Sequence, residues 1–205
     1  MFVLVCVGGE ILTTHDDIVE AADRLFYQQG YEKTSFTDIA EAVKISRGNF
    51  YYHFRTKDEI LAAVIGLRLA NTQKLLDKWQ EEGVLPQDRI RNFINILIMN
   101  RVKIKQFGCP VGTLCSELAK LDHSLLGEAN KLFELFRKWL RKQFQSMGFG
   151  SKKEADAHAM HVLAFSQGVA TLANAFHDEK FIKKEVKQME AWLDGLPCQS
   201  ADTEK

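Results

Sequence analysis

The sequence predicts an all-α protein with about nine helices. Turn-forming residues are scarce, because the 205 residues include only 3 prolines and 13 glycines. Sandwiches and barrels need many tight turns, so this composition favours long helices. No segment reads as a convincing strand, and no internal repeat recurs at a fixed period.

The first helix is expected to begin at Thr13 or Thr14, either of which can cap it, and to end at Gly30. Asp16 and Asp17 place negative charge in the first turn, where the helix dipole favours it. The apolar residues of this segment recur at helical spacing: Ile18, Ala22, Leu25 and Phe26.

Three more helices are expected in the next part of the chain. A second, short helix opens at Thr37, and a tight turn at 44–45 separates it from a third helix over 46–53. Thr56 then caps a long fourth helix over about 57–82.

The remaining helices are separated by breaks. Pro86 starts a helix that runs to about Gln106. The break at 107–110 ends in Pro110, and another helix is expected to begin there because proline is favoured at the first helical position. Residues 148–151 form a linker. The later helices are expected at about 110–121, 124–147, 152–177 and 179–194.

Charge and cysteine content limit the classes of function. Lys plus Arg and Asp plus Glu number 27 each, so any nucleic-acid site must be a local basic patch. The 4 cysteines include no CxxC pair, which excludes a disulfide-built fold and favours a reducing, cytoplasmic compartment. No stretch approaches the roughly 20 apolar residues of a membrane span. No cofactor-binding loop or nucleophile elbow indicates an enzyme.

Residues 36–55 predict a helix-turn-helix, FTDIAEAVKISRGNFYYHFR. Ala40 is small where the two helices cross, and an apolar seam is expected to hold the pair against Leu25 and Phe26. That seam consists of Ile39, Val43, Ile45, Phe50 and Phe54. Gly48 allows close backbone approach, and the other exposed positions carry groups that suit base edges and phosphates. These are Ser46, Arg47, Asn49, Tyr51 and Tyr52.

Positive charge is concentrated on the same segment. Four basic residues and no acidic ones lie from Lys44 to Lys57, whereas the first expected helix is acidic. A solvated basic face would give the same charge pattern. The capping, turn and aromatic pattern together with the charge favours DNA binding.

The stretch YEKTSFTDIAEAVKISRGNFYYHFRTKDEIL resembles the N-terminal DNA-binding domain of the TetR/AcrR family of transcriptional regulators. The resemblance covers residues 13–61 and implies a homodimeric, all-helical repressor that binds a pseudo-palindromic DNA operator. Its third helix would enter the major groove. Lys44 departs from the family pattern, in which glycine is common, and lysine fits poorly there if the backbone is left-handed.

The resemblance also implies roles for single residues. Arg47, Gly48 and Asn49 would face bases. Tyr51, Tyr52 and Lys57 would mainly hold phosphates, with Thr37 helping from the second helix.

The resemblance and the linkers suggest four parts of the chain. Residues 13–60 are expected to form the helix-turn-helix domain, and 61–195 a ligand-binding and dimerisation domain that dimerises through its last two helices. Residues 1–12 are expected to be a flexible leader, with a short docked strand as the alternative, and 196–205 a flexible tail. A small-molecule effector would release the DNA. An architectural or nucleoid-associated protein without a ligand is the alternative function.

Aromatic residues of the second half of the chain either line an effector pocket or belong to the hydrophobic core of that half. They are Phe93, Phe107, Phe133, Phe136, Trp139, Phe165 and Phe176.

The stretch FGCPVGTLCSEL resembles a cysteine-containing segment of a TetR subgroup, some members of which respond to electrophiles or oxidants. Cys109 precedes a predicted helix start, where unpaired N–H groups favour a thiolate. Cys109 is therefore a candidate effector-sensing residue, and a small buried residue at the break is the alternative.

A metal site is the least favoured interpretation of the second half. Glu154, His158 and His161 share one helical face, as metal ligands can, but no second cluster completes a ligand set. We therefore expect ordinary histidines on a packed helix, with no metal and no cofactor, and a helical metalloenzyme is the rejected alternative.

Overall fold

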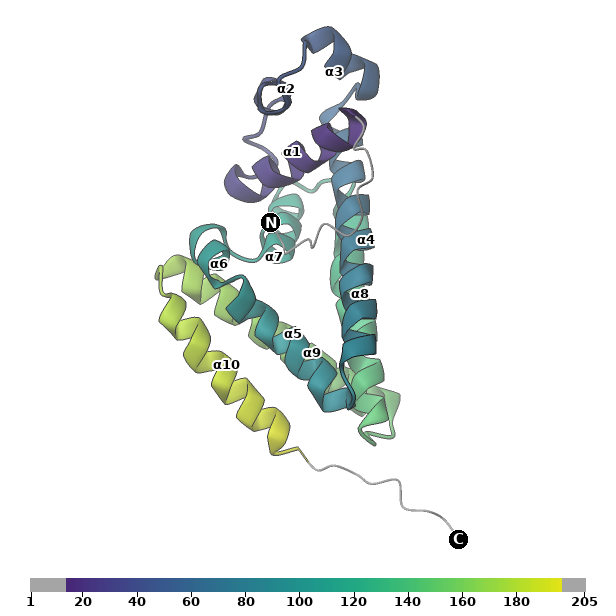
Figure 1. The fold of residues 1–205 in the computed structure, drawn as a ribbon, viewed down its shortest axis with the longest axis vertical. Coiled ribbons are helices and arrows are strands. Elements are labelled where there is room, and N and C mark those ends of the chain that lie inside the picture. Colours follow the sequence, from purple (N-terminus) through teal and green to yellow (C-terminus); the bar gives the residue numbers. More distant parts are fainter. Residues whose placement is uncertain (1–13, 197–205) are drawn as a thin grey trace. The chain divides into compact units, whose positions relative to one another are not determined.

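The computed structural model describes residues 14–196, which fold into α-helices with no strand in that range (Figure 1). The all-α prediction is confirmed. The leader, Thr13, Cys6, Cys198 and all but the first residue of the expected tail lie outside the described residues. The helices are α1 (Thr14–Gln29), α2 (Phe36–Val43), α3 (Arg47–His53), α4 (Lys57–Glu82), α5 (Pro86–Met99), α6 (Arg101–Phe107), α7 (Pro110–Lys120), α8 (Leu126–Ser146), α9 (Lys152–Ala175) and α10 (Glu179–Asp194).

One predicted helix, over 86–106, is divided into α5 and α6 at Asn100. The backbone there leaves helical geometry, with φ −104° and ψ 8°. The side-chain amide and the backbone N–H of Asn100 both donate to the carbonyl of Ile96, at 2.9 Å and 3.1 Å. Asn100 therefore ends α5 with a side-chain hydrogen bond to the last turn, and α6 begins at the next residue.

The second helix begins one residue earlier than predicted, at Phe36 rather than Thr37, because Ser35 caps it. The Ser35 hydroxyl accepts the Asp38 N–H at 3.2 Å, and the Asp38 carboxylate accepts the Ser35 N–H at 2.8 Å. This is a reciprocal capping box. The hydrogen bond from the Ser35 backbone lowers the pKa of Asp38 below its ordinary value.

The described residues divide into two compact units. Unit 1 consists of 14–71 and 110–132, and unit 2 consists of 72–109 and 133–196. Helices α4 and α8 each contribute residues to both units. Unit 1 is therefore built from two stretches that lie far apart in the sequence.

In unit 1, α1 packs against α2 and α7. Three of the five predicted seam residues, Ile39, Phe50 and Phe54, are at most 4% exposed, and the other two, Val43 and Ile45, are half-buried. Of the residues expected to face the seam, Phe26 is 4% exposed and Leu25 is half-buried. The seam thus fixes α3 with one face inward.

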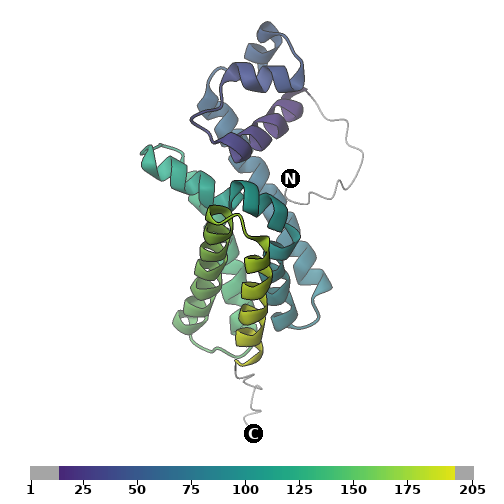
Figure 2. The same cartoon turned by 90° about the vertical axis from the view of Figure 1, so that its left-hand side faces the viewer.

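In unit 2, α10 packs against α5 and α9, and the green α9 and yellow-green α10 run side by side in Figure 2. Their inward residues, such as Val162, Val169 and Val186, are at most 4% exposed. Among residues 14–196, no helix is both long enough and apolar enough to cross a membrane.

Candidate nucleic-acid interface

The turn between α2 and α3 is built on a left-handed lysine. Lys44 has φ 60° and ψ 40°, and its N–H bonds to the carbonyls of Ala40 and Glu41. A non-glycine residue in this region costs about 1–2 kcal/mol. Lys44, where the family commonly has glycine, therefore occupies the left-handed position of the turn, and glycine would be favoured at that position.

Helix α3 presents a polar face to solvent because its start is capped and its apolar side chains are buried against the rest of the domain. Ser46 is the N-cap, as expected, and its hydroxyl accepts the Asn49 N–H at 3.3 Å. Phe50 and Phe54 are buried beneath the helix. Arg47 and Asn49 are consequently exposed.

Gly48 lies in the same exposed stretch. A Cβ built on this glycine meets no atom within 4 Å, so the space above the backbone is open. A DNA backbone or base edge can approach α3 closely at this point.

The two tyrosines of α3 are exposed with their rings supported by neighbours. Tyr51 is 53% exposed and its ring lies 5.7 Å from that of Phe36, whereas Tyr52 is 84% exposed and lies 5.2 Å from the ring of His53. Each can present its hydroxyl to a phosphate.

A pocket of about 250 Å³ lies between α2 and α3. It brings together three of the residues predicted to bind DNA, namely Thr37, Arg47 and Tyr51. Two hydroxyls and a guanidinium are suited to hydrogen-bond acceptors on DNA. The complete lining is Phe36, Thr37, Ala40, Glu41, Ile45, Arg47, Phe50 and Tyr51.

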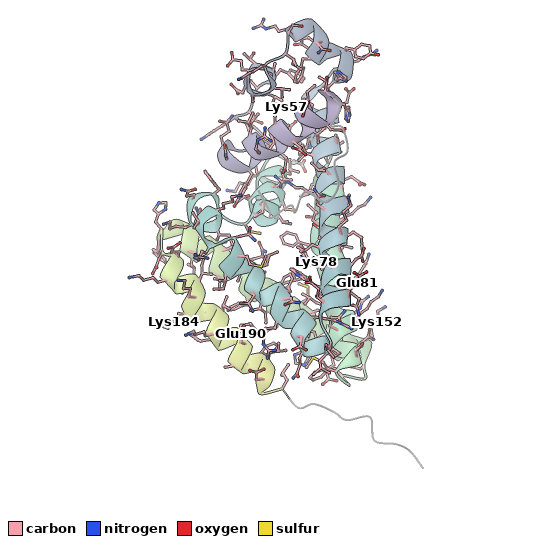
Figure 3. All side chains as sticks on the ribbon, in the orientation of Figure 1. Lys57, Lys78, Glu81, Lys152, Lys184 and Glu190 are labelled. Carbon is pink, nitrogen blue, oxygen red and sulfur yellow. The ribbon has the colours of Figure 1, made fainter. Side chains whose placement is uncertain are left out.

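Lys57 has a structural role that sequence reasoning missed. Its ammonium donates to the carbonyls of Tyr31 (3.1 Å) and Glu32 (3.2 Å) and lies 4.3 Å from the centre of the Tyr31 ring. Figure 3 labels Lys57 and, further along α4, the exposed Lys78. Lys57 thus ties the start of α4 to the connection between α1 and α2, and a phosphate would share an ammonium that already has two acceptors.

Tyr31 is the centre of a polar cluster in unit 1. Its hydroxyl donates to Asp58 at 2.6 Å and lies 3.2 Å from Nε2 of His123. The carboxylate of Glu117 accepts the backbone N–H groups of Tyr31 and Glu32, both at 2.9 Å. Burial and the hydrogen bond to Asp58 raise the pKa of Tyr31 above its ordinary value.

Arg68 forms a second connection within unit 1. It is 7% exposed, and its Nε donates to Asp23 of α1 at 2.5 Å while Nη1 donates to the carbonyl of Pro110 at 2.7 Å. The first residue of α7 is therefore linked through one guanidinium to α1 and α4.

Models of two protein families match the chain. Residues 18–64 match the bacterial regulatory proteins of the tetR family, and residues 86–188, half of the chain, match the LmrA/YxaF-like C-terminal domain of transcriptional regulators. The chain belongs to the TetR family. It is a transcriptional regulator and not an enzyme.

Individual relatives agree with this TetR assignment. An HTH-type transcriptional regulator from the lacX 3′ region of Lactococcus lactis subsp. lactis is 28% identical over 171 residues, which cover 80% of this chain and 85% of the relative. The HTH-type transcriptional repressor DhaR of Mycobacterium sp. (strain GP1) is 27% identical over 129 residues, or 62% of each chain. A crystal structure of a TetR transcriptional regulator from Legionella pneumophila matches with a TM-score of 0.78 at 25% identity, covering 90% of this chain and 97% of that one.

In this TetR-family chain, Cys109 directly precedes α7, which begins at Pro110 as expected. Its side chain is half-buried, and the amide Nε2 of Gln167 donates to its sulfur at 3.5 Å. Cys115 is 6% exposed within α7. The two thiols thus differ in access.

The histidines of α9 pack against aromatic rings. The ring of His158 lies 4.5 Å from that of Phe149, and the ring of His161 lies 4.7 Å from that of Trp192. Residues 14–196 contain no group of three side chains placed to hold a metal ion.

Proposed function

We propose that the chain is a cytoplasmic repressor that binds a pseudo-palindromic operator as a homodimer and releases it when an effector binds. The observation that carries the proposal is the exposed face of α3, with Arg47, Gly48 and Asn49 outward and Phe50 buried. The relative DhaR is named as a repressor. A single helix-turn-helix covers too little DNA for tight specific binding, so two copies are needed.

The exposed face of α9 supports the dimer. No Asp, Glu, Lys or Arg occurs from Ala157 to His177. Met160 and Leu172 of α9 are each 43% exposed, and Phe176, the C-cap of the helix, is 73% exposed. Gly168 has open space around its Cα. An uncharged surface with small residues suits close packing against a second copy of α9.

The exposed face of α10 is different from what the sequence suggested. Its apolar residues Ile182 and Val186 are at most 2% exposed and serve the core of unit 2. The outward positions carry lysines: Lys180, Lys183, Lys184 and Lys187. We therefore assign most of the dimer contact to α9.

Cys109 is proposed as an electrophile-sensing residue. Its sulfur is half-buried beside the start of α7 and accepts a hydrogen bond from the Gln167 amide at 3.5 Å, so an electrophile can reach it more easily than the buried Cys115. A thiolate that adds to a quinone forms a carbon–sulfur bond, and the quinone oxygen takes up a proton. The added group would displace the Gln167 amide from the half-buried sulfur and disturb the backbone that leads into α7.

DNA binding is tested by selecting bound sequences from a random duplex pool with the full chain. Arg47→Ala and Asn49→Ala are expected to relax the selected sequence, at about 1–3 kcal/mol for each lost base contact. Lys57→Ala is expected to weaken binding equally across sequences and to reduce the salt slope by about one unit. Lys78→Ala, an exposed lysine paired with Glu82, is the control for charge alone.

Sedimentation and selection together distinguish the alternatives. A dimer with a palindromic selected site supports the proposal. A chain that binds all sequences equally, with no effector response, is instead an architectural DNA-binding protein. A monomer with full operator affinity at micromolar concentration contradicts the dimer.

The thiol is tested by mild quinone treatment followed by mass spectrometry. Cys109 is expected to react before Cys115, because Cys115 is buried. Operator release is expected to accompany modification and to disappear in Cys109→Ser. Normal release by that variant would assign the response to non-covalent binding elsewhere.

A further inference from the structure

Unit 2 contains a buried donor that no side chain or carbonyl of the described residues satisfies. Trp139 on α8 is 9% exposed, and its indole Nε1 has no hydrogen-bond partner among residues 14–196. A buried indole N–H usually finds an acceptor, because the hydrogen bond to water that it gives up must be replaced. Trp139 is therefore a candidate to donate to a bound molecule.

Trp139 lies in a group of buried aromatic side chains, here called the indole cluster: Trp79, Phe93, Phe136 and Trp139. The ring centres are 5.9 Å apart for Trp79 and Trp139, 6.4 Å for Trp79 and Phe93, and 5.3 Å for Phe93 and Phe136. The members come from α4, α5 and α8, and all belong to unit 2. The cluster offers aromatic faces and no charged side chain, and of its two indole N–H groups the one of Trp139 is buried without a hydrogen-bond partner among residues 14–196.

The polar network around Gln143 does not serve this donor. Gln143 lies one turn beyond Trp139 on α8 and is 3% exposed, but its side chain is already 2.9 Å from Gln80 and 3.4 Å from Arg89. The other buried side-chain atom without a hydrogen bond in the described range is Nε of Arg101. That side chain is 37% exposed and lies 3.9 Å from Glu179, so Trp139 is the more deeply buried of the two.

We infer that the indole cluster binds the effector, and that the effector is an uncharged, planar, largely apolar molecule with an oxygen that accepts the Trp139 N–H. Aromatic walls favour flat apolar ligands, and one buried donor fixes their orientation. Burying an ion among these rings would cost too much. The inference rests on the proposed function, since it gives the chemistry of an effector that releases DNA without reacting with Cys109.

Effector binding would also change the packing of unit 2, and a regulator needs such a difference between its bound and unbound conformations. The rings of the cluster contact one another, so a ligand that enters must separate them. The bound protein then has a different packing of α4 against α5 and α8 within unit 2. An effector shifts an equilibrium only through such differential contacts.

The test compares two planar probes of nearly equal shape, 2-acetylnaphthalene and 2-isopropenylnaphthalene, of which only the ketone has an oxygen that accepts the Trp139 N–H. Their dissociation constants for the full chain are measured by equilibrium dialysis. In Trp139→Phe the ratio of ketone to hydrocarbon affinity is expected to fall by about threefold to tenfold. Trp192→Phe, which changes a tryptophan of another aromatic cluster, is expected to leave the ratio unchanged.

An unchanged ratio in Trp139→Phe overturns the inference, as does failure of both probes to bind the wild-type chain. Phe136→Leu keeps the donor and removes a wall, so it should weaken both probes equally. Operator binding is measured separately. Probe binding with the expected ratio but no DNA release would preserve the indole-cluster site and contradict the proposed function, whereas DNA release with an unchanged ratio would contradict the site alone.

Discussion

The carboxylate of Glu117 accepts the backbone N–H of Tyr31 at 2.9 Å, although 86 residues separate the two in the chain. The same carboxylate accepts the N–H of Glu32 and lies against Gly30, where a Cβ would come within 2.9 Å of its oxygen. One side chain of α7 thus fixes the connection that leads from α1 to α2.

Glu117→Gln is expected to destabilise the chain by about 1–2 kcal/mol, because an amide has a single acceptor oxygen where the carboxylate uses two. Hydrogen exchange of the Tyr31 and Glu32 amides should accelerate. Glu128→Gln removes an exposed partner of Lys131 and should change stability by less than about 1 kcal/mol. Equal protection of both amides in the Glu117 variant and the wild type would refute this role.

Arg68→Met is expected to cost about 2–4 kcal/mol in the free energy of unfolding, measured by urea denaturation. The change leaves the half-buried Asp23 carboxylate and the Pro110 carbonyl without the donor that the buried Arg68 supplies. Arg24→Met is the control, because the contact of Arg24 with Glu20, at 4.0 Å, is exposed to solvent. Similar losses in both variants would show that the connection adds nothing beyond an ordinary surface arginine.

Lys44→Gly is expected to stabilise the chain by about 0.5–1 kcal/mol, because glycine adopts φ 60° without the steric cost of a Cβ. The gain is partly offset by the greater freedom of glycine in the unfolded chain. Lys33→Gly, at a position without a positive φ, should not stabilise. Thermal melts of both variants provide the comparison, and a loss of stability on Lys44→Gly would contradict the strain.

Asp156 is expected to make stability depend on pH. The hydrogen bond from Arg137 lowers the pKa of the Asp156 carboxyl, with Arg141 adding to the effect. The contribution is present above the unfolded value of about 3.9 and is lost as the pH falls toward the folded value. Asp156→Asn should therefore be less stable than wild type at pH 7 and should lose less stability below about pH 4.

The exposed Glu81 of α4, labelled in Figure 3, provides the control for this pH dependence. Glu81→Gln should leave the acid part of the stability curve unchanged. If Asp156→Asn follows the wild-type curve at all pH values, the pairing with Arg137 does not stabilise the fold.

Features set by neighbouring residues were predictable from the sequence, and features set by distant ones were not. The caps of α3 and α4 and the start of α7 follow from local chemistry at Ser46, Thr56 and Pro110. The capping box at Ser35 has an equally local pattern and was missed because Thr37 offered a rival cap.

The connections made by Arg68 and Glu117 had no signal in the sequence. Arg68 reaches partners 45 and 42 positions away, and nothing in either segment marks the pairing. Lys57 has contacts that the sequence did not indicate. Its place in a basic run predicts a phosphate contact, which stays a prediction. Its hydrogen bonds to the carbonyls of Tyr31 and Glu32 had no signal in the sequence, because every residue carries the same backbone carbonyl.

Unit 1 has a consequence for engineering chimeric regulators. The matched helix-turn-helix model ends at residue 64, but the compact unit needs residues 110–132 as well. A fusion that joins the first 64 residues to another sensor would discard Arg68, Glu117 and the segment from Pro110 onward. A DNA-binding domain transferred from this chain to another sensor therefore has to include both stretches, joined by a new linker. Recombination at a single crossover point would give a helix-turn-helix that lacks the contacts made by Arg68 and Glu117.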